Sequence, residues 1–247
     1  MAPDSTSVIL PADQAFLSGT LQMPESAAGH YVESLPLWSD FTVNTVLLVV
    51  ATLLILFSIR IILNITPLLL DSLSRWKACV NIDASVQLKG DRNSLAAVVT
   101  LPMALIADRY DFFRAGVLDL VPQGWSSLVT LGIIIIWLLI RQFAYYFCSL
   151  KALRPETFRT VHTSFFNYWI LAGFLLILTA GVLSLTSVGD GIGRSILLYE
   201  LAVMYLLAIL RKSQILLSYC GPLTTFLYLC ALEFIPTGAL IAGCILL

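Results

Sequence analysis

Charged residues are scarce in this sequence. Only 12% of the 247 residues are Asp, Glu, Lys or Arg, compared with about 25% in soluble domains. Hydrophobic residues make up 59% of the chain, and the mean hydropathy is +0.91. A chain with so little polar surface cannot cover itself with hydrated side chains, so we expect lipid to be its solvent.

Histidine and paired cysteines, which build most metal and nucleophilic sites, are also nearly absent. The sequence has only His30 and His162, expected on opposite sides of the membrane, and its five cysteines show no CxxC spacing. A histidine-based metal site or a Ser-His-Asp triad therefore has no basis here. No soluble segment exceeds about 40 residues, which is too short for a separate catalytic domain. We expect no metal and no cofactor, and the net charge of −1 gives no reason to expect nucleic acid as a partner.

Six apolar stretches predict an all-α fold, a polytopic bundle of transmembrane helices. The predicted spans are residues 38–59, 95–107, 125–140, 165–185, 196–210 and 222–247. The second is the weakest because it is short and contains Pro102, so a re-entrant segment there is the alternative. Stretches shorter than the roughly 20 residues of a full crossing are expected to continue as helices into polar flanks such as 108–118 and 141–150.

The positions of Lys and Arg predict the orientation. Residues 1–59 contain neither, and with six spans the alternate loops carry 11 basic residues on one side and 3 on the other. The positive-inside rule places the 11 in the cytoplasm, so both termini are expected outside. Omitting the weak second span would reduce the asymmetry to 8 against 6. We therefore expect an extracytoplasmic, partly disordered tail over residues 1–37, followed by a six-span domain over residues 38–247.

Glu233 is the most informative single residue, because it lies well inside the last predicted span. A carboxylate at that depth costs several kcal/mol unless it is paired or protonated, so intramembrane acids usually face the bundle interior. Pro236 lacks an N–H and frees the carbonyl of Leu232, beside Glu233. Two interpretations stay open: a neutral hydrogen-bonded clamp between helices, or an acid that handles protons in transport. Tyr228 and Cys230 belong to the same segment and are further polar candidates.

Glu200 is the second acid within a predicted span, and its nearest charge in sequence is Arg194. A partner on another helix is an equally good expectation. If the fifth and sixth spans pack as neighbours, a relay between Glu200 and Glu233 is conceivable.

A charged group is expected at the outer side, formed by Asp108, Arg109, Asp111 and Arg114. One interpretation is a site for a headgroup or a partner. The simpler one, which we favour, is the solvated end of a helix with local Asp–Arg pairs that each contribute at most about 1 kcal/mol.

A second polar group, Arg154, Arg159 and His162, lies at the cytoplasmic entrance to the fourth span. Arg159 is suited to hold a phospholipid phosphate by charge-assisted hydrogen bonds, which makes these residues candidate headgroup contacts. Positive-inside anchoring explains the same charges more simply.

Small residues occur at helix-packing spacing in two spans. They are Ala172, Gly173, Ala180 and Gly181 in the fourth, and Gly238, Ala239, Ala242 and Gly243 in the sixth. Such residues let helix backbones approach closely in lipid. They favour a tight bundle or an oligomer.

The final third of the chain resembles a bacterial multi-pass inner-membrane family, a domain of unknown function found in Gram-negative envelopes. The resemblance rests on the basic turn at 209–215, on Gly221-Pro222, and on the pattern Tyr-Leu-Cys-x-Leu-Glu-x-x-Pro from Tyr228 to Pro236. It implies an inner-membrane helical bundle and no particular reaction.

These observations lead us to expect a non-enzymatic assembly or scaffold component of an envelope complex. Its expected partners are the lipid bilayer and either another membrane protein or a second copy of the chain. The alternative is a proton-coupled transporter or channel subunit that uses Glu233 and Glu200. A third interpretation is a lipid-processing enzyme with its headgroup site between Arg154 and His162.

Overall fold

The computed structural model describes residues 38–74, 85–113, 121–149, 155–186, 189–218 and 221–246. Within these ranges all regular structure is helical, which confirms the all-α expectation. The fold described below is that of the unit from Trp38 to Leu247. The predicted extracytoplasmic tail lies outside the described residues.

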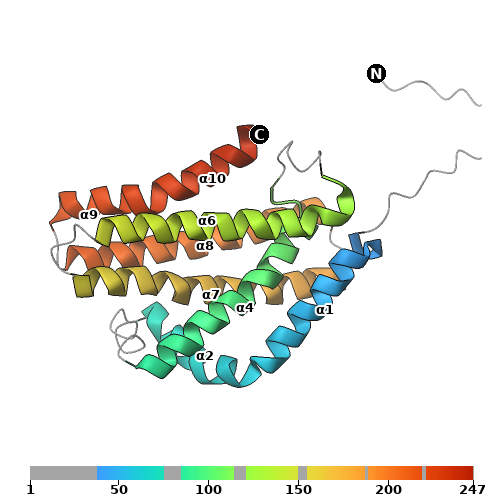
Figure 1. Cartoon of the computed structure of the whole chain (residues 1–247), viewed down its shortest axis with the longest axis horizontal. Coiled ribbons are helices and arrows are strands. Elements are labelled where there is room, and N and C mark those ends of the chain that lie inside the picture. The colour runs from blue at the N-terminus through green and yellow to red at the C-terminus, as the bar shows by residue number, and fades with distance from the viewer. Residues whose placement is uncertain are drawn as a thin grey trace, which may run out of the picture. The chain divides into compact units, whose positions relative to one another are not determined.

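Eight α-helices, two short 3-10 turns and one π-helical turn are described. They are η2 (Trp38–Asp40), α1 (Thr42–Phe57), α2 (Ile59–Ser74), α4 (Val86–Arg109), η3 (Gln123–Trp125), α6 (Ser126–Ser149), α7 (Pro155–Leu185), α8 (Asp190–Leu217), α9 (Pro222–Leu229), the π-helical η4 (Cys230–Phe234) and α10 (Ile235–Leu246). In Figure 1, α6, α7 and α8 run nearly parallel, α4 crosses them obliquely, and α10 diverges from α6 toward its end.

Four segments of the described chain are long and apolar enough to cross a membrane. They are Ser126–Tyr146, Val161–Leu185, Asp190–Leu217 and Pro222–Ala242, and they coincide with the third to sixth predicted spans. As expected for the flank at 141–150, α6 continues through Arg141 to Ser149. Arg141 therefore lies within a helix, and its charge must be accommodated there.

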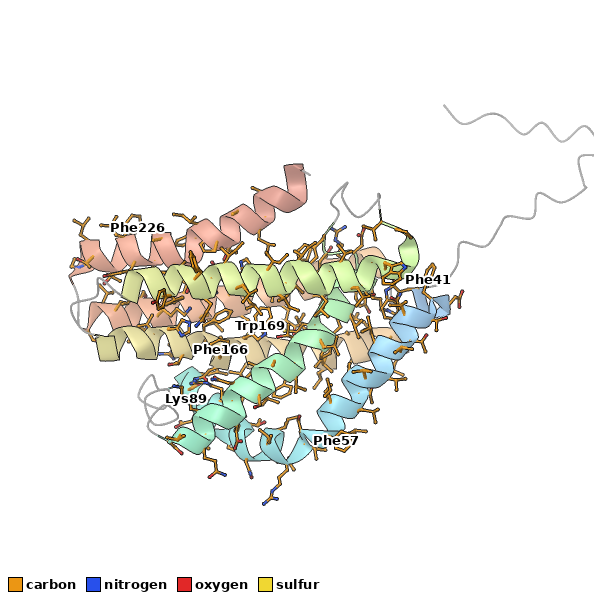
Figure 2. All side chains as sticks on the ribbon, in the orientation of Figure 1. Phe41, Phe57, Lys89, Phe166, Trp169 and Phe226 are labelled. Atoms are coloured by element: carbon orange, nitrogen blue, oxygen red, sulfur yellow. The ribbon has the colours of Figure 1, made fainter. Side chains whose placement is uncertain are left out.

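The first predicted span, residues 38–59, contains η2 and α1 and ends where α2 begins. The two helices α1 and α2 meet at a bend of 70°, and they are long and apolar enough to cross a membrane only when taken as a pair. The N–H of Ser58 is shared between the carbonyls of Leu54 and Ile55, as is common where a helix ends. Phe57, 82% exposed, lies at this bend in Figure 2.

The second predicted span is the middle of the longer helix α4, whose first turns carry Lys89, Asp91 and Arg92. With these charges α4 is not among the four apolar spans, so the count of six spans stays a prediction. The expected continuation of this helix into the flank at 108–118 is wrong where the flank is described, because α4 ends at Arg109 and Asp111 adopts a left-handed φ of 51°. Residues 114–118 lie outside the described residues.

The main core lies where α4 packs against α7. A Cβ atom added to Gly173 would lie 2.0 Å from Cγ1 of Val99 and 3.0 Å from the sulfur of Met103. Only glycine allows this approach, so the small-residue pattern at 172–173 serves helix packing. The indole N–H of Trp169 donates to Oγ1 of Thr100 across the same interface, 3.0 Å away, and Figure 2 shows Trp169 inside the bundle.

A buried ion cluster as the candidate functional site

The last span is interrupted by the π-helical turn that contains Glu233. At its end the N–H of Ile235 bonds to the carbonyl of Cys230, five residues back. Pro236 explains this local structure, because it offers no N–H and its ring would clash with the carbonyl of Leu232 in a regular helix. Glu233 is only 2% exposed, so the expected inward orientation is correct.

Two cations hold the Glu233 carboxylate. Nη2 of Arg141, on α6, lies 2.5 Å from Oε1 of Glu233, and Nζ of Lys212, on α8, forms an ion pair with the same oxygen. Arg141 and Lys212 are 3% and 1% exposed. Three helical segments far apart in sequence are therefore joined at one oxygen atom. An isolated charge at this depth would carry a large desolvation penalty, which the pairing offsets.

Aromatic side chains surround this ion cluster, which we define as Arg141, Lys212 and Glu233. The hydroxyl of Tyr145 donates to Oε1 of Glu233 at 3.1 Å. The guanidinium carbon of Arg141 lies 3.4 Å from the ring centroid of Phe165, and Nζ of Lys212 lies 5.0 Å from the same centroid. Both cations thus face a π-system as well as a carboxylate, which favours their burial.

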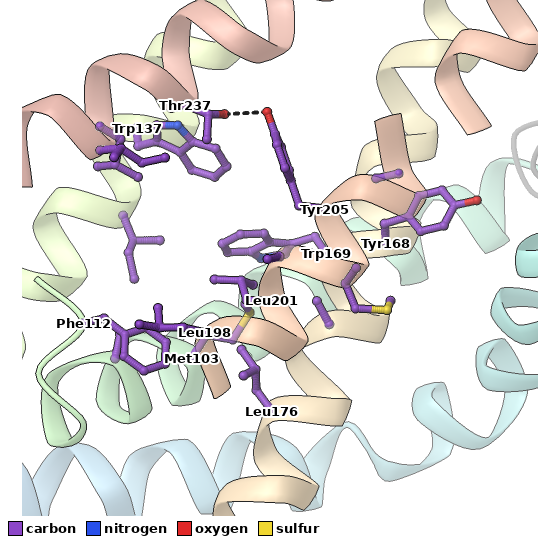
Figure 3. A pocket seen from close by; sticks show the side chains of 18 of the residues that line it. Met103, Phe112, Trp137, Tyr168, Trp169, Leu176, Leu198, Leu201, Tyr205 and Thr237 are labelled. Atoms are coloured by element: carbon purple, nitrogen blue, oxygen red, sulfur yellow. Dashed lines mark hydrogen bonds between the residues drawn. The ribbon is translucent and has the colours of Figure 1, made fainter. Parts of the chain in front are cut away.

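Tyr205 anchors the backbone of the same turn. Its hydroxyl donates to the backbone carbonyl of Glu233 at 3.1 Å and lies 3.0 Å from Oγ1 of Thr237. Figure 3 shows the bond between Tyr205 and Thr237. Tyr205 therefore links α8 to both the π-helical turn and the start of α10.

The partners of Glu233 are two basic side chains, which neither of the two interpretations from the sequence included. The formal charges of Arg141, Lys212 and Glu233 sum to one positive charge. One buried nitrogen, Nη1 of Arg141, has no hydrogen-bond partner.

The other residues of the last-span motif lie beside the ion cluster. Pro236 is buried, and Tyr228 packs against Tyr145 and Leu232. Cys230 is a partly buried free thiol. These residues belong to the segment that carries Glu233.

Glu200 does not join the ion cluster. It precedes Lys212 on α8 by a distance of about 18 Å along the helix, at about 1.5 Å per residue, and its buried Oε1 has no hydrogen-bond partner. No hydrogen bond or ion pair between Glu200 and Glu233, or between Glu200 and Arg194, is present among the described residues. A direct relay between the two acids is therefore unsupported.

The three candidate headgroup residues are only partly described. His162 shares a hydrogen bond of 2.7 Å with Oε1 of Gln142 on α6, and its ring lies edge-on to Tyr145, 4.4 Å between centroids. Arg154 lies outside the described residues. Arg159 falls within α7, but its side chain is outside the described part. His162 thus serves the contact between α6 and α7.

In the outer charged group, the carboxylate of Asp108 accepts hydrogen bonds from uncharged side chains. Oδ2 of Asp108 accepts hydrogen bonds from the indole of Trp38 at 2.7 Å and from the hydroxyls of Ser126 and Ser127 at 3.2 and 2.5 Å. Asp108 therefore connects the end of α4 to η2, just before α1, and to the start of α6. Arg109 is exposed and faces the ring of Tyr110.

Of the two further members of that outer group, Asp111 alone lies in the described part of the chain. Asp111 occupies the left-handed position just after α4, and Arg114 lies outside the described residues. The local Asp–Arg pairing expected from the sequence gives way, at Asp108, to hydrogen bonds with residues distant in the chain.

Sequence reasoning missed Arg141 and Lys212 as partners of Glu233, because both were assigned to cytoplasmic flanks. A usable signal was present. Arg141 follows an unbroken apolar run and is followed by another largely apolar stretch, so a helix that continues past it must bury or pair the guanidinium.

Comparison of the chain with models of known protein families, with curated proteins and with solved structures finds no match. Any functional assignment must therefore rest on the geometry described above.

Proposed function

We propose that this chain is a multi-pass protein of a bacterial inner membrane that acts without catalysis, as a rigid component of a membrane complex. The observation that carries the proposal is the ion cluster. A proton carrier needs its acid to exchange protons with water on both sides in turn. Glu233 is instead 2% exposed and is paired with two cations from two other helices. This arrangement suits a fixed structural contact better than a mobile proton site.

Six crossings remain our preferred topology. Helix α4 has 24 residues, about 36 Å at 1.5 Å per residue, which exceeds the roughly 30 Å hydrocarbon thickness. The pair of α1 and α2 supplies a further, broken crossing. Under the positive-inside rule the ends of α6 and α8 that carry Arg141 and Lys212 face the cytoplasm, and both termini face outward.

The ion cluster orients the last helix for contact with a partner. It fixes η4 to α6 and α8, and α10 follows immediately. Gly238, Ala239 and Ala242 of α10 are exposed, and a Cβ added to Gly238 would meet no atom within 4 Å. Such a face lets another transmembrane helix approach closely. We expect the partner, a second membrane protein or a second copy, to bind there.

Purification from native membranes in a mild detergent tests this proposal. We expect a stoichiometric partner, or a particle mass of more than one copy. Gly238→Leu and Ala239→Leu should remove the partner without lowering the melting temperature. Gly181→Leu is the matched control, because Gly181 also faces open space but lies on α7. A single-copy particle without a protein partner would contradict the proposal. Equal loss of the partner in all three variants would contradict it too.

The transporter interpretation makes a different prediction. The double variant Glu233→Gln, Lys212→Met keeps the formal charge of the ion cluster but removes its acid. Under our proposal this variant folds and retains the partner, and wild-type proteoliposomes show no proton flux above empty vesicles. A wild-type flux that disappears in the double variant would favour transport instead.

A further inference from the structure

A large, partly open apolar cavity lies between the helices, beside the ion cluster but outside it. Its volume is about 710 Å³, and residues of α4, α6, α7, α8 and α10 line it. The size falls within the range of about 300–1,000 Å³ typical of small-molecule sites. Most of the lining is aliphatic or aromatic, including Met103, Leu176, Leu201 and Leu240, and Figure 3 shows Trp137, Trp169 and Tyr205 around the same space.

The cavity has one cation, Arg194, near the start of α8. Arg194 makes no hydrogen bond or ion pair among the described residues, and it is partly exposed. An arginine with free donors beside an apolar space is complementary to a carboxylate or a phosphate that carries a hydrocarbon chain.

The opposite end of the cavity is formed by the aromatic side chains that border the ion cluster. Trp137, Phe165 and Tyr205 line the cavity, and the Arg141 guanidinium lies 5.6 Å from the Trp137 ring centroid. Arg194 and Tyr205, both on α8, are about 16 Å apart along the helix at 1.5 Å per residue. The cavity therefore offers an elongated apolar space with a positive charge at one end.

We infer that this cavity binds a single-chain anionic amphiphile, with its carboxylate or phosphate on Arg194 and its chain directed toward Trp137. The ligand class follows from two independent features. One is an apolar volume long enough for an extended chain, and the other is a cation at one end that has no partner within the described part of the chain. The inference goes beyond the proposed function, since a structural component can hold a lipid with or without a protein partner.

Quenching of tryptophan fluorescence tests the inference in the full chain in nanodiscs. The probe is a long-chain fatty acid brominated near the end of its chain, because bromine quenches only tryptophans close to it. Trp137 and Trp169 line the cavity. We expect saturable quenching, which largely disappears in a Trp137→Phe, Trp169→Phe variant. The methyl ester of the same acid measures partition into lipid and should quench without saturation.

Arg194→Gln should weaken binding of the brominated acid at least 10-fold, while Arg194→Lys should retain most of it. The matched control is Arg109→Gln, which removes an exposed arginine outside the cavity and should leave binding unchanged. Equal melting temperatures without ligand establish that the variants fold. Displacement by an alkyl phosphate at lower concentration than by an alkyl carboxylate would identify phosphate as the preferred headgroup, and the reverse would identify carboxylate.

Three results would overturn the inference: no saturable quenching in the wild type, equal saturable quenching by the acid and its ester, or unchanged affinity in Arg194→Gln. Loss of the protein partner has no bearing on these readouts, so this inference and the proposed function fail separately.

Discussion

Lys212 of α8 and Glu233 of η4 form an ion pair in which the side chains are 1% and 2% exposed. The two residues lie on different helical segments, so local helix geometry does not bring them together. The pairing is created by the way in which the last span packs back on α8. With Arg141 on the same carboxylate oxygen, it joins three helical segments at a single point.

Removal of the carboxylate is expected to be strongly destabilising. Glu233→Gln leaves two buried cations without their counter-charge, and breaking a buried ion pair from one side costs about 3–5 kcal/mol. Adding Lys212→Met should restore part of this loss, because one of the unpaired cations is removed. Thermal and denaturant unfolding in detergent measures both. Glu200→Gln is the control, since Glu200 lies outside the ion cluster, and a similar loss in Glu200→Gln and Glu233→Gln would contradict this account.

Arg141 should not be replaceable by lysine without loss. Its guanidinium stacks 3.4 Å from the Phe165 ring centroid while Nη2 contacts Glu233. Lysine keeps the charge but loses the planar stacking, so we expect Arg141→Lys to lower stability by about 1–2 kcal/mol. If stacking is responsible, Phe165→Leu in the Arg141→Lys background should cost less than in the wild type. Additive effects in this double-mutant cycle would show that the contact between Arg141 and Phe165 contributes nothing to stability.

Much of the architecture follows from hydropathy. Long apolar runs predict α6, α7, α8 and the last span, because lipid requires every backbone group to be bonded within a helix. The inward position of Glu233 follows from the same physics, since a carboxylate cannot face acyl chains at that depth. Gly173 likewise marks a close helix contact, with α4 as its partner.

The partners of Glu233 could not be predicted from hydropathy. A window that penalises charge ends a span before Arg141 and before Lys212, although both helices continue past these residues. Which cation reaches which acid depends on helix rotation and packing, and Arg141 is 92 residues from Glu233 in sequence. Helix α2 was not predicted for a related reason, because Arg60 ends the hydropathy window of the first span although a helix continues from Ile59 to Ser74.

Asp108 is expected to stabilise the contact between α4, α1 and α6. Asp108→Ala would remove the carboxylate that accepts from the Trp38 indole, Ser126 and Ser127. The Ser127 hydroxyl can still donate to Oδ1 of Asn44, so the main loss is expected at the Trp38 indole. Buried unsatisfied donors cost about 1–3 kcal/mol each, so with partial rehydration we expect a loss of about 2–3 kcal/mol. Unfolding in detergent measures this change in the free energy of unfolding. The control is Arg109→Gln, one residue away and exposed, which should change stability little. If Asp108→Ala is as mild as Arg109→Gln, the network is not stabilising.

Gly173 should tolerate no larger residue while α4 keeps its place. Gly173→Ala puts a methyl group 2.0 Å from Cγ1 of Val99, and overpacking of this kind typically costs about 1–3 kcal/mol. Val99→Ala removes the methyl group in the way, so the double variant should recover most of the loss. Gly181→Ala lies on the same helix with no atom within 4 Å, and it should be neutral or slightly stabilising because alanine favours helices. Unfolding of the wild type, Gly173→Ala, Val99→Ala, the double variant and Gly181→Ala in one detergent measures these effects. Equal destabilisation by Gly173→Ala with and without Val99→Ala would mean that contact between α4 and α7 does not limit the residue at position 173.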